Sequence, residues 1–515
     1  MGRPRKQDYV AVALDFGTGT IFLAVRYHDG RIEVLRDPDG NSPTMSAIAF
    51  EDGDPKRPLF GIAALNYRQI APQWVATMNK RALYGHPGIP LMTDKNGKEW
   101  TAVELSTLLI KHLLDGAAVG TGKRIDPTVH TVPAFWDSKT RELLGGIIEQ
   151  AGYKSLRPIN EPTAALFGFG VDTAKTGTYL VLDCGMGTSD VTIMRVGKNE
   201  YIVLATAGRD DSAGREMTRA LIGRCVEEMA KRNVALDPQR DLREYILLEN
   251  AVEAAKLQLS SQRKAFITWR AGGELFDLEV TRQDYEALIT SILQEIGSLV
   301  DEALSAAGLT PEQTDGVLAV GGACRTPAIQ GLLVTRFGEK KILESIDRDT
   351  AVVKGAAAAI GLKIKEAIET RNDHELAAIA PEYALQCEDK LREVTGADLG
   401  VEAIDVAKEE AAFLSIIPAN TPLPHESTKV CGLRDETGSG TVPIRVLQGQ
   451  ASRPLADAHE LAVFRMDNLP PGRTKDRIEI SFSIDSSGIV AVRAKDLESN
   501  QEIIGEVDAS EAVTK

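Results

Sequence analysis

The sequence predicts an α/β protein made of two similar halves, followed by a separate antiparallel β domain. Residues 9–365 alternate short apolar strands with amphipathic helices, which is typical of α/β folds. The pattern Leu-Asp-x-Gly-x-Gly-Thr occurs twice in that region, around Asp15 and around Asp183. Residues 394–510 contain short runs that alternate apolar and polar residues, separated by turn-like segments. The repeat indicates a duplication within the α/β part.

Length and composition limit the classes of function. A chain of 515 residues is too long for one ordinary core, so we expect at least two domains. No apolar run approaches the roughly 18 residues needed to span a bilayer, and the polar start of the chain lacks a signal-peptide core. We therefore expect a cytosolic (cytoplasmic) protein that does not bind a membrane. The net charge of −15 and the lack of a long basic block argue against nucleic acid as a partner.

The five cysteines lie far apart and show no Cys-x-x-Cys spacing. This pattern predicts reduced thiols rather than a disulfide framework or a zinc site. They are residues 184, 225, 324, 387 and 431.

Changes in composition give the expected domain boundaries. A polar tail at 1–8 precedes the α/β region at 9–365. A charged, helix-prone connector follows at 366–393, and the β domain occupies 394–510 before a short tail at 511–515.

The repeated turn has the chemistry of a phosphate-binding site. Glycines allow backbone N–H groups to approach phosphate oxygens closely. The aspartate would repel phosphate, so we expect it to act through Mg²⁺ and its waters. One such turn alone is more often only a tight turn, but two in matching strand contexts favour a clamp with one turn on each side of the phosphates. The candidate phosphate-binding residues are Asp15, Gly17, Thr18 and Gly19 in the first turn, and Gly185, Met186, Gly187 and Thr188 in the second.

Three further segments complete the pattern. "PINEPTAALFGFG" places Glu161 before a helix of small residues, and "GVLAVGGACRTPAIQGLL" is a strand that ends at Gly321 and Gly322, which suits close approach to a nucleoside. "DRDTAVVKGAAAAIGL" predicts Asp349 as the N-cap of a helix whose alanines allow tight packing. In this order the segments resemble the actin-like ATPase superfamily, which implies a two-lobed, duplicated fold of the RNase H type.

Within that superfamily the chain resembles the seventy-kilodalton heat-shock chaperone family of the DnaK type. The phrases that carry the resemblance include "VPAFWDSKTRELL", "VLDCGMGTSDVTI", "IIPANTPLP" and "IEISFSIDSSGIVAVRAKD". The resemblance covers roughly 9–365 and 394–510. It implies an ATP-dependent chaperone that uses ATP and Mg²⁺ and binds extended, unfolded peptides in a β-sandwich. It also implies a J-domain co-chaperone and a nucleotide exchange factor as partners.

The resemblance assigns roles around the nucleotide. Three carboxylates in one site would repel one another, so the fold demands a cation there. Each of these residues also has a structural explanation. Asp190 could be only a turn residue, and Lys80 could be a solvated surface charge. Glu161 could be an acidic residue that the helix dipole favours at a helix N-terminus. The implied metal site is Asp15, Asp183 and Asp190. The implied catalytic residues are Lys80, Glu161, Asp183 and Thr188. The implied nucleoside contacts are Glu253, Lys256, Ser260, Gly321, Gly322, Arg325 and Asp349.

Two further sets of residues concern the β domain. The first, implied to relay the nucleotide state, consists of Pro133, Arg141 and Arg157; an ordinary turn proline and two surface arginines are the alternative. The second, implied to line a pocket for one apolar side chain of a peptide, consists of Leu399, Val401, Ile404, Val442 and Ile444. Because residues along a strand alternate between its two faces, this second set could equally form the core of the sandwich.

The chain departs from the family at several places. Met186 replaces a glycine of the second phosphate turn, and Leu257 stands where the family has an arginine over adenine. The segment "SAGREMT" lacks the acidic residues that the family usually has after its glycine pair, and the stretch from Lys80 to Pro133 is shorter than is usual in the family. The connector reads "EDKLREVTG" in place of a leucine-rich linker, and no helical lid is expected, so we expect rapid exchange of peptide.

These departures leave two alternatives to an ATP-hydrolysing chaperone. One is a nucleotide-gated scaffold that binds ATP with little or no turnover. The other is a small-molecule kinase of the same superfamily, for which a peptide-binding β domain has no use. For the chaperone itself, we expect ATP hydrolysis to be slow.

Overall fold

The computed structural model describes most of the chain, in twelve segments. The expected tails at 1–8 and 511–515, and residues 372–389 of the expected connector, lie outside the described residues. The described residues are 9–77, 79–84, 86–170, 176–198, 200–343, 348–371, 390–405, 410–435, 440–451, 453–469, 472–486 and 488–506.

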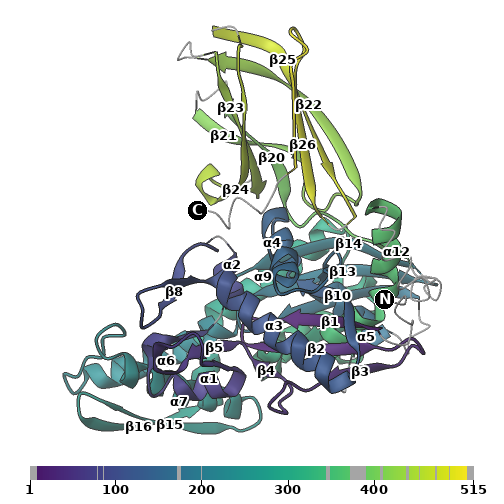
Figure 1. The fold of residues 1–515 in the computed structure, drawn as a ribbon. Coiled ribbons are helices and arrows are strands. Elements are labelled where there is room, and N and C mark those ends of the chain that lie inside the picture. The colour runs from purple at the N-terminus through teal and green to yellow at the C-terminus, as the bar shows by residue number, and fades with distance from the viewer. Residues whose placement is uncertain are drawn as a thin grey trace.

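The first half of the α/β region, lobe I, is built on a mixed sheet in the order β11-β10-β1-β2-β3, with β4 paired to β2 (Figure 1). β1 is antiparallel to β2 and parallel to β10. Both faces of β1 are buried, as its nearly continuous apolar run requires. The strands are β1 (Tyr9–Phe16), β2 (Thr20–Arg26), β3 (Ile32–Leu35), β4 (Thr44–Met45), β10 (Arg124–Val132) and β11 (Ile159–Asn160).

Lobe II repeats this arrangement with the order β18-β17-β12-β13-β14, to which β19 adds at the edge. β12 is antiparallel to β13 and parallel to β17, as β1 is to β2 and β10. The predicted duplication is therefore confirmed at the level of strand pairing. The strands are β12 (Gly177–Cys184), β13 (Ser189–Gly197), β14 (Glu200–Arg209), β17 (Gly316–Val320), β18 (Ile342–Leu343) and β19 (Lys390–Arg392).

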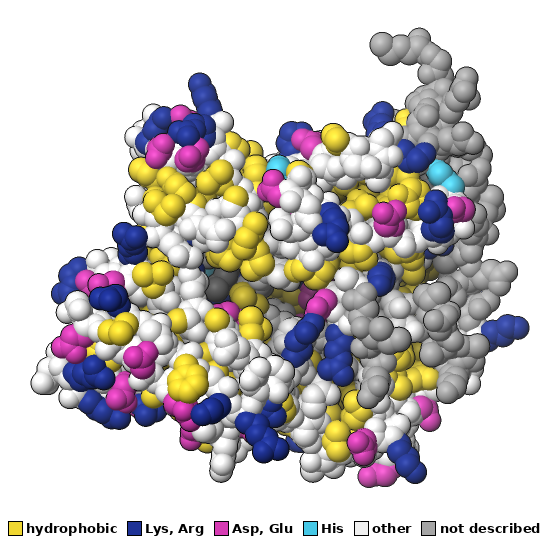
Figure 2. Space-filling view, turned by 90° about the horizontal axis from the view of Figure 1, so that it is seen from below, with side chains coloured by type: hydrophobic (Ala, Val, Ile, Leu, Met, Phe, Trp, Pro, Cys, Tyr) yellow, Lys and Arg dark blue, Asp and Glu magenta, His cyan; other side chains and the backbone are white. Residues whose placement is uncertain are grey.

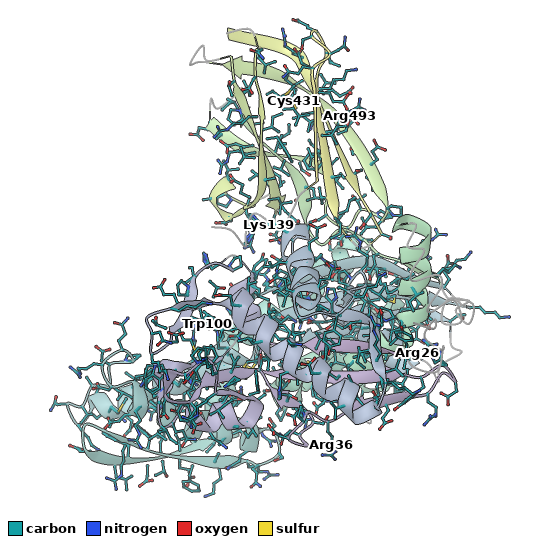
Figure 3. All side chains as sticks on the ribbon, in the orientation of Figure 1. Arg26, Arg36, Trp100, Lys139, Cys431 and Arg493 are labelled. Carbon is teal, nitrogen blue, oxygen red and sulfur yellow. The ribbon has the colours of Figure 1, made fainter. Side chains whose placement is uncertain are left out.

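Two helices, α5 (Glu161–Gly170) and α11 (Ala351–Ala358), pack tightly against each other and belong to one buried core with strands of both sheets. A Cβ added at Gly355 would lie 1.7 Å from the carbonyl oxygen of Ala164, so only glycine fits at this crossing. The predicted tight packing of the alanine-rich helix is confirmed. At its C-terminal end, the Arg26 guanidinium donates to the carbonyl oxygens of Ala357 and Ala358 (Figure 3).

The prediction that Asp349 caps α11 is wrong. The N-cap residue is Thr350, and no side chain there accepts a capping hydrogen bond. The Asp349 carboxylate instead forms an ion pair with Arg325 of the same lobe, because a guanidinium is a stronger partner than a backbone N–H.

The remaining helices and hairpins surround the two sheets. The predicted apolar stripe from Met217 to Met229 is buried in the core of lobe II. Around lobe I lie β5 (Ala47–Phe50), β6 (Pro58–Phe60), β7 (Val75–Thr77), β8 (Pro90–Thr93), β9 (Glu99–Thr101), α1 (Gly61–Tyr67), α2 (Asn79–Leu83), α3 (Ala102–Thr121) and α4 (Ser138–Gln150). Around lobe II lie α6 (Gly214–Ala230), α7 (Leu242–Leu259), β15 (Lys264–Ala271), β16 (Glu274–Thr281), α8 (Arg282–Leu288), α9 (Thr290–Ala306) and α10 (Pro327–Phe337). After α11, α12 (Ile360–Arg371) ends the α/β part.

The C-terminal domain is a sandwich of two four-stranded antiparallel sheets, as predicted. The sheets have the orders β21-β20-β23-β24 and β22-β25-β26-β27, and their inner faces share one apolar core. The strands are β20 (Asp398–Asp405), β21 (Glu410–Ile417), β22 (His425–Asp435), β23 (Val442–Gly449), β24 (His459–Met466), β25 (Gly472–Ile484), β26 (Val490–Asp496) and β27 (Glu502–Glu506).

The β domain rests on the α/β part at the level of α4 and β14 (Figure 1). Lys139, the second residue of α4, lies at this junction (Figure 3). The hydroxyl of Ser138 accepts a hydrogen bond from the backbone N–H of Val490 at 3.0 Å, and the Ser138 N–H donates to Gln448. The N-terminus of α4 is therefore a fixed point of contact between the domains.

The surface carries charges of both signs. On the face shown in Figure 2, Lys and Arg side chains are interspersed with Asp and Glu side chains rather than gathered in a basic field. Among the described residues, no helix combines the length and apolar character that crossing a membrane requires.

Candidate functional site

The two glycine-rich turns, one from each lobe, face each other. A Cβ added at Gly187 would lie 2.5 Å from the Thr18 hydroxyl oxygen, and one added at Gly19 would lie 2.8 Å from the Cε atom of Met186. Each turn therefore contacts the other through a glycine. The predicted clamp, with one turn per lobe, has the geometry that the repeat suggested.

The second turn is held by the start of α6. The backbone N–H groups of Gly214 and Arg215 donate to the carbonyl oxygens of Gly185 and Met186 at 3.0 and 2.9 Å. Met186 is not among the described residues with left-handed backbone, so its side chain causes no strain of that kind. Its thioether instead projects against Gly19 in the opposite turn.

Three aspartates converge beside the turns. Burial, and then the negative charge of Glu161, raise the pKa of Asp15 to about 6 and that of Asp190 to about 8. The pKa of Asp183 is raised well above its ordinary value by burial and by the charges of Glu161, Asp190 and Asp15. The site thus brings together carboxylates whose ionised forms repel one another, which favours a bound cation.

Mg²⁺ fits these residues. Asp190 Oδ1 accepts a hydrogen bond from the Ala134 N–H at 3.0 Å, whereas the buried Asp190 Oδ2 has no hydrogen-bond partner. Asp15 Oδ1 accepts one from the Thr131 hydroxyl at 2.8 Å. Within the described ranges, no group of three or more Asp, Glu, His or Cys residues is close enough to hold an ion directly. The unpartnered Asp190 oxygen, together with the neighbouring Asp15 and Asp183, is the feature that suits these carboxylates to a cation.

Lys80 lies inside this site and is not a surface charge. Its side chain is almost fully buried, forms an ion pair with Glu161, and lies with Nζ 5.3 Å from the centre of the Trp136 ring. Glu161 is also the first residue of α5, so it has both the position favoured by the helix dipole and a partner in the cleft. The Lys80 ammonium group brings a positive charge to this set of carboxylates and opposes the rise in the pKa of Asp15 and Asp190.

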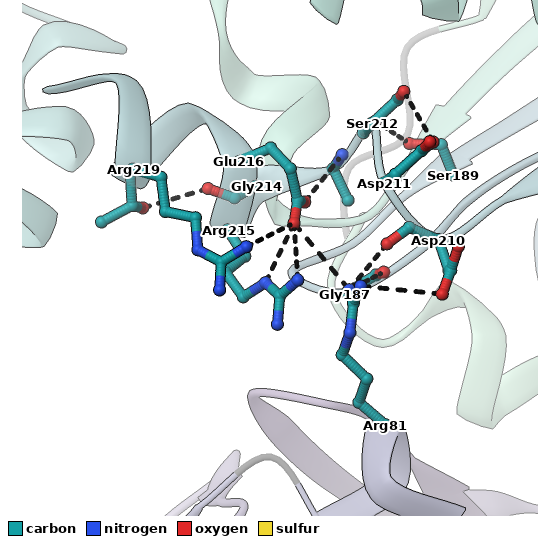
Figure 4. A network of polar contacts seen from close by, with 12 residues as sticks. Arg81, Gly187, Ser189, Asp210, Asp211, Ser212, Gly214, Arg215, Glu216 and Arg219 are labelled. Carbon is teal, nitrogen blue, oxygen red and sulfur yellow. Dashed lines mark hydrogen bonds and ion pairs between the residues drawn. The ribbon is translucent and has the colours of Figure 1, made fainter. Parts of the chain in front are cut away.

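The neighbouring Arg81 connects the lobes (Figure 4). Its guanidinium donates to the carbonyl oxygens of Gly187 at 3.2 Å and Asp210 at 2.6 Å. Arg215 pairs with Glu216 at 2.8 Å in the same network. In the segment that lacks the usual acidic residues, Glu216 thus supplies the carboxylate, and a lobe I side chain fixes the second phosphate turn.

The expected nucleoside residues lie together on lobe II. Lys256 Nζ forms an ion pair with Glu253 at 2.8 Å and donates to the Thr218 hydroxyl, while Ser260 directly follows the last residue of α7. Gly321 has a φ of 85°, and a Cβ there would lie 2.4 Å from the carbonyl oxygen of Cys184, so glycine is required. Gly322 and Arg325 bound the next turn, η5 (Gly322–Arg325).

Leu257 lies on the same part of α7 and leaves an apolar surface there. Its side chain is 57% exposed. An aliphatic residue cannot supply the charge that an arginine would place over a base, which leaves Arg325 as the guanidinium among the expected nucleoside residues.

The residues expected to relay the nucleotide state lie between the aspartates and the β domain. Arg141 is buried and donates to the carbonyl oxygens of Pro133, Ala134 and Trp136. Ala134 is the residue whose N–H binds Asp190. Arg157 forms an ion pair with Asp485 of the β domain at 3.1 Å. Neither arginine is an ordinary surface residue.

The end of the connector is docked in the α/β part. β19 pairs with β14 in parallel, and the next residue, Glu393, is buried and accepts a hydrogen bond from the Asn160 amide at 2.9 Å. Burial raises the pKa of Glu393, while the positive charges of Lys363 and Arg141 oppose that rise. The Glu393 carboxylate is therefore buried beside the Asn160 amide and near the positive charges of Lys363 and Arg141.

The expected peptide-pocket residues have mixed environments. Leu399, Val401 and Ile444 are buried in the sandwich core, and Val442 packs against that core. Ile404, at the end of β20, is 40% exposed. Of this set, Ile404 has the greatest surface to offer a ligand.

The chain is similar to a known family over most of its length. The family model described as Hsp70 protein matches residues 85–515. The chain belongs to the Hsp70 family. The Chaperone protein DnaK of Thermus thermophilus is 32% identical over 96% of this chain and 79% of its own length. The same-named proteins of Thermotoga maritima and Thermosipho melanesiensis are 32% and 33% identical over 96% of this chain and 80% of theirs. The chain is thus a DnaK-type Hsp70 protein.

Sequence reasoning missed several residues of this Hsp70 site. Arg81 could have been found, since it adjoins Lys80 on α2. Glu393 could also have been found, because it is the acidic residue that ends the unusual linker. Tyr84 and His459, whose hydroxyl and Nε2 lie 2.9 Å apart across the domain junction, carry no local signal because their contact is long-range.

Proposed function

We propose that this Hsp70-type protein is a chaperone that hydrolyses ATP between its lobes and binds extended peptides in its β domain. The observation that carries the proposal is the convergence of the two facing turns, the three aspartates and the buried Lys80–Glu161 pair. Family membership supports a general ATPase activity and chaperone function.

In this proposal the protein acts by positioning and by neutralising charge. The backbone N–H groups of the two turns cradle the phosphates, and Lys80 neutralises charge on the outermost one. Glu161 orients Lys80 and the attacking water, and the hydroxyl of Thr188 is the second polar group available to that water. Asp15, Asp183 and Asp190 would hold Mg²⁺, which would offset phosphate charge there.

The proposed coupling to peptide binding runs through the domain junction. Asp190 contacts Ala134, and Arg141 binds the same loop and lies beside Glu393 of the connector. A change at the aspartates would therefore reach β19 and the β domain through packed, hydrogen-bonded groups. Pro133 and Arg157 belong to the same route.

The proposed partners follow from the surface at this junction. A cleft of about 1140 Å³ lies between α2, β14 and the β domain, with Arg81, Phe135, Arg209, Asp398 and His459 among its lining residues. Charged side chains of both signs line it, which supports docking of a J-domain co-chaperone over this junction. Opening of the lobes to release nucleotide is the step for an exchange factor.

Single-turnover hydrolysis of ATP tests the proposal. Because Lys80 is buried opposite the aspartates, Lys80→Ala should slow hydrolysis by about 100-fold or more. Lys98→Ala removes an exposed lysine of lobe I and should leave the rate unchanged. Nucleotide binding measured by calorimetry confirms that each variant is folded.

A scaffold that binds ATP without turnover is the second candidate. Met186 favours it, because the thioether lies between the two turns, where the phosphates would bind. Equal hydrolysis rates for the wild type and Lys80→Ala, with ATP bound by both, would support the scaffold.

A further inference from the structure

The indole ring of Trp136 lies against the ammonium group of Lys80. The Nζ atom of Lys80 is 5.3 Å from the centre of the ring. This is within the roughly 6 Å over which a cation is attracted to an aromatic face. Both side chains are almost fully buried, so little water screens the attraction. Since the ammonium group also pairs with Glu161, it is held by a carboxylate and by an aromatic ring.

The backbone of Trp136 is fixed on both sides. Its N–H donates to the carbonyl oxygen of Pro133 at 3.2 Å, and its own carbonyl oxygen accepts from Arg141 Nε at 2.9 Å. The next residue, Asp137, is the N-cap of α4 and accepts a hydrogen bond from the Thr140 N–H at 2.7 Å. The start of the Trp136 side chain therefore has a defined place.

The ring itself is also packed on more than one side. It belongs to the apolar core of lobe I, and it lies parallel to the Tyr84 ring with the two centres 6.4 Å apart. Tyr84 directly follows α2, the helix that carries Lys80. Trp136 thus lies beside this segment at two places, through Lys80 and through Tyr84.

A lysine that neutralises phosphate charge must keep N–H groups available for the phosphate. The ammonium group has three donors, and the Glu161 carboxylate accepts from it. An aromatic face attracts the positive charge through its quadrupole, so it restrains the side chain without taking a donor as a polar neighbour would. Two donors therefore remain, on a flexible side chain that is already oriented before nucleotide arrives.

We propose that Trp136 is a positioning residue that holds the Lys80 ammonium group in place for ATP hydrolysis. The effect on hydrolysis rests on the function proposed above, whereas the contact between the ring and the ammonium group does not. The competing explanation is that Trp136 only fills the core of lobe I. The two differ because attraction of a cation depends on the electrons of the ring, and filling a core depends on its shape.

Fluorine NMR of the full chain, labelled with fluorotryptophan, tests the contact. The chain has four tryptophans, whose resonances single Trp→Phe variants assign. We expect Lys80→Met, which removes the charge and keeps a side chain of similar length, to shift the Trp136 resonance. Lys98→Ala is the matched control, because Lys98 Nζ lies 3.7 Å from the centre of the Trp100 ring, and it should shift only the Trp100 resonance. A Trp136 resonance unaffected by Lys80→Met would overturn the proposal.

Single-turnover hydrolysis with fluorinated tryptophan at position 136 tests the consequence. A singly fluorinated and then a tetrafluorinated ring weaken the attraction for a cation stepwise, with little change in shape. We expect hydrolysis to slow in that order, by about tenfold with tetrafluorotryptophan. ATP affinity measured by calorimetry should stay the same, because the two turns still hold the phosphates. Tetrafluorotryptophan at Trp100, the other ring with a lysine over it, should leave the rate unchanged.

The remaining outcomes separate the explanations. Equal rates with all three rings at position 136 would overturn the proposal. A rate that falls in Trp136→Leu but in neither fluorinated protein would assign Trp136 to packing alone, and would also overturn it. A wild type that binds ATP without hydrolysing it would refute the proposed function instead, and the NMR result would stand.

Discussion

At the scale of single residues, Met186 is the departure with the clearest consequence. Its thioether lies against Gly19 in the facing turn, in the space between the two halves of the clamp. Its backbone is not left-handed, so the glycine common in the family is not required there for conformation. The side chain, rather than the backbone, is what distinguishes this turn.

Removing the Met186 side chain should therefore raise ATP turnover. We expect both Met186→Gly and Met186→Ala to increase single-turnover hydrolysis by about tenfold, because each clears the space between the turns. If only the glycine variant gained activity, backbone freedom would be the cause. Unchanged or lower rates in both variants would contradict this account of Met186.

Leu257 offers a second test at one residue. Leu257→Arg restores a guanidinium at an exposed position of α7 beside the nucleoside residues, and a cation–π contact there is worth roughly 0.5–2 kcal/mol. Calorimetry should show about 2- to 30-fold tighter ATP binding. Leu247→Arg, an exposed leucine earlier on α7, is the matched control and should leave affinity unchanged.

At the scale of elements, β19 is the part whose role the structure changes most. The leucine-rich linker of the family is here Lys390–Arg392, yet the strand still pairs with β14 and places Glu393 against Asn160. Main-chain hydrogen bonds do not depend on side-chain identity, so a polar segment can occupy this edge. The connector therefore pairs with β14 although it lacks the leucine-rich sequence of the family.

Docking of this strand should depend on pH. Burial raises the pKa of Glu393 in the docked state, so protonation of Glu393 favours docking. This contribution to the stability of the docked strand is lost as pH rises through the docked-state pKa. Trypsin cleavage after Lys390 or Arg392 reports undocking and should therefore quicken, relative to cleavage elsewhere in the chain, as pH rises from the acidic side.

Glu393→Gln isolates this effect. The neutral amide keeps an acceptor for Asn160, so the pH dependence of linker cleavage should flatten. Glu426→Gln, an exposed glutamate of β22, should behave like the wild type. A profile for Glu393→Gln that still follows the wild type would contradict the assignment.

At the scale of the whole molecule, the sequence predicted the duplicated sheets, the β-sandwich and the facing turns because each rests on a local pattern. Glycine spacing after a buried strand predicts a turn wherever it occurs. The capping role of Asp349 was wrong because its partner, Arg325, comes from a different element. The contacts of Glu393 with Asn160 and of Tyr84 with His459 could not be predicted, since they depend on how separate domains dock.

The same docking makes the molecule a candidate for coupling between its sites. Lys80 and Tyr84 lie four residues apart, with Lys80 against Trp136 and Tyr84 against His459 of the β domain. This short path from Lys80, together with the route through Arg141, gives two connections to the β domain. Because both cross the junction, a change in nucleotide should alter how the β domain holds peptide.

The central claim, that nucleotide controls peptide binding, is tested most directly by the dissociation rate of a fluorescently labelled, leucine-rich peptide from the full chain. With saturating Mg²⁺ in both cases, we predict that ATP accelerates dissociation by about tenfold or more over ADP. Equal dissociation rates with ATP and ADP, from a protein that binds both nucleotides and the peptide, would contradict the account.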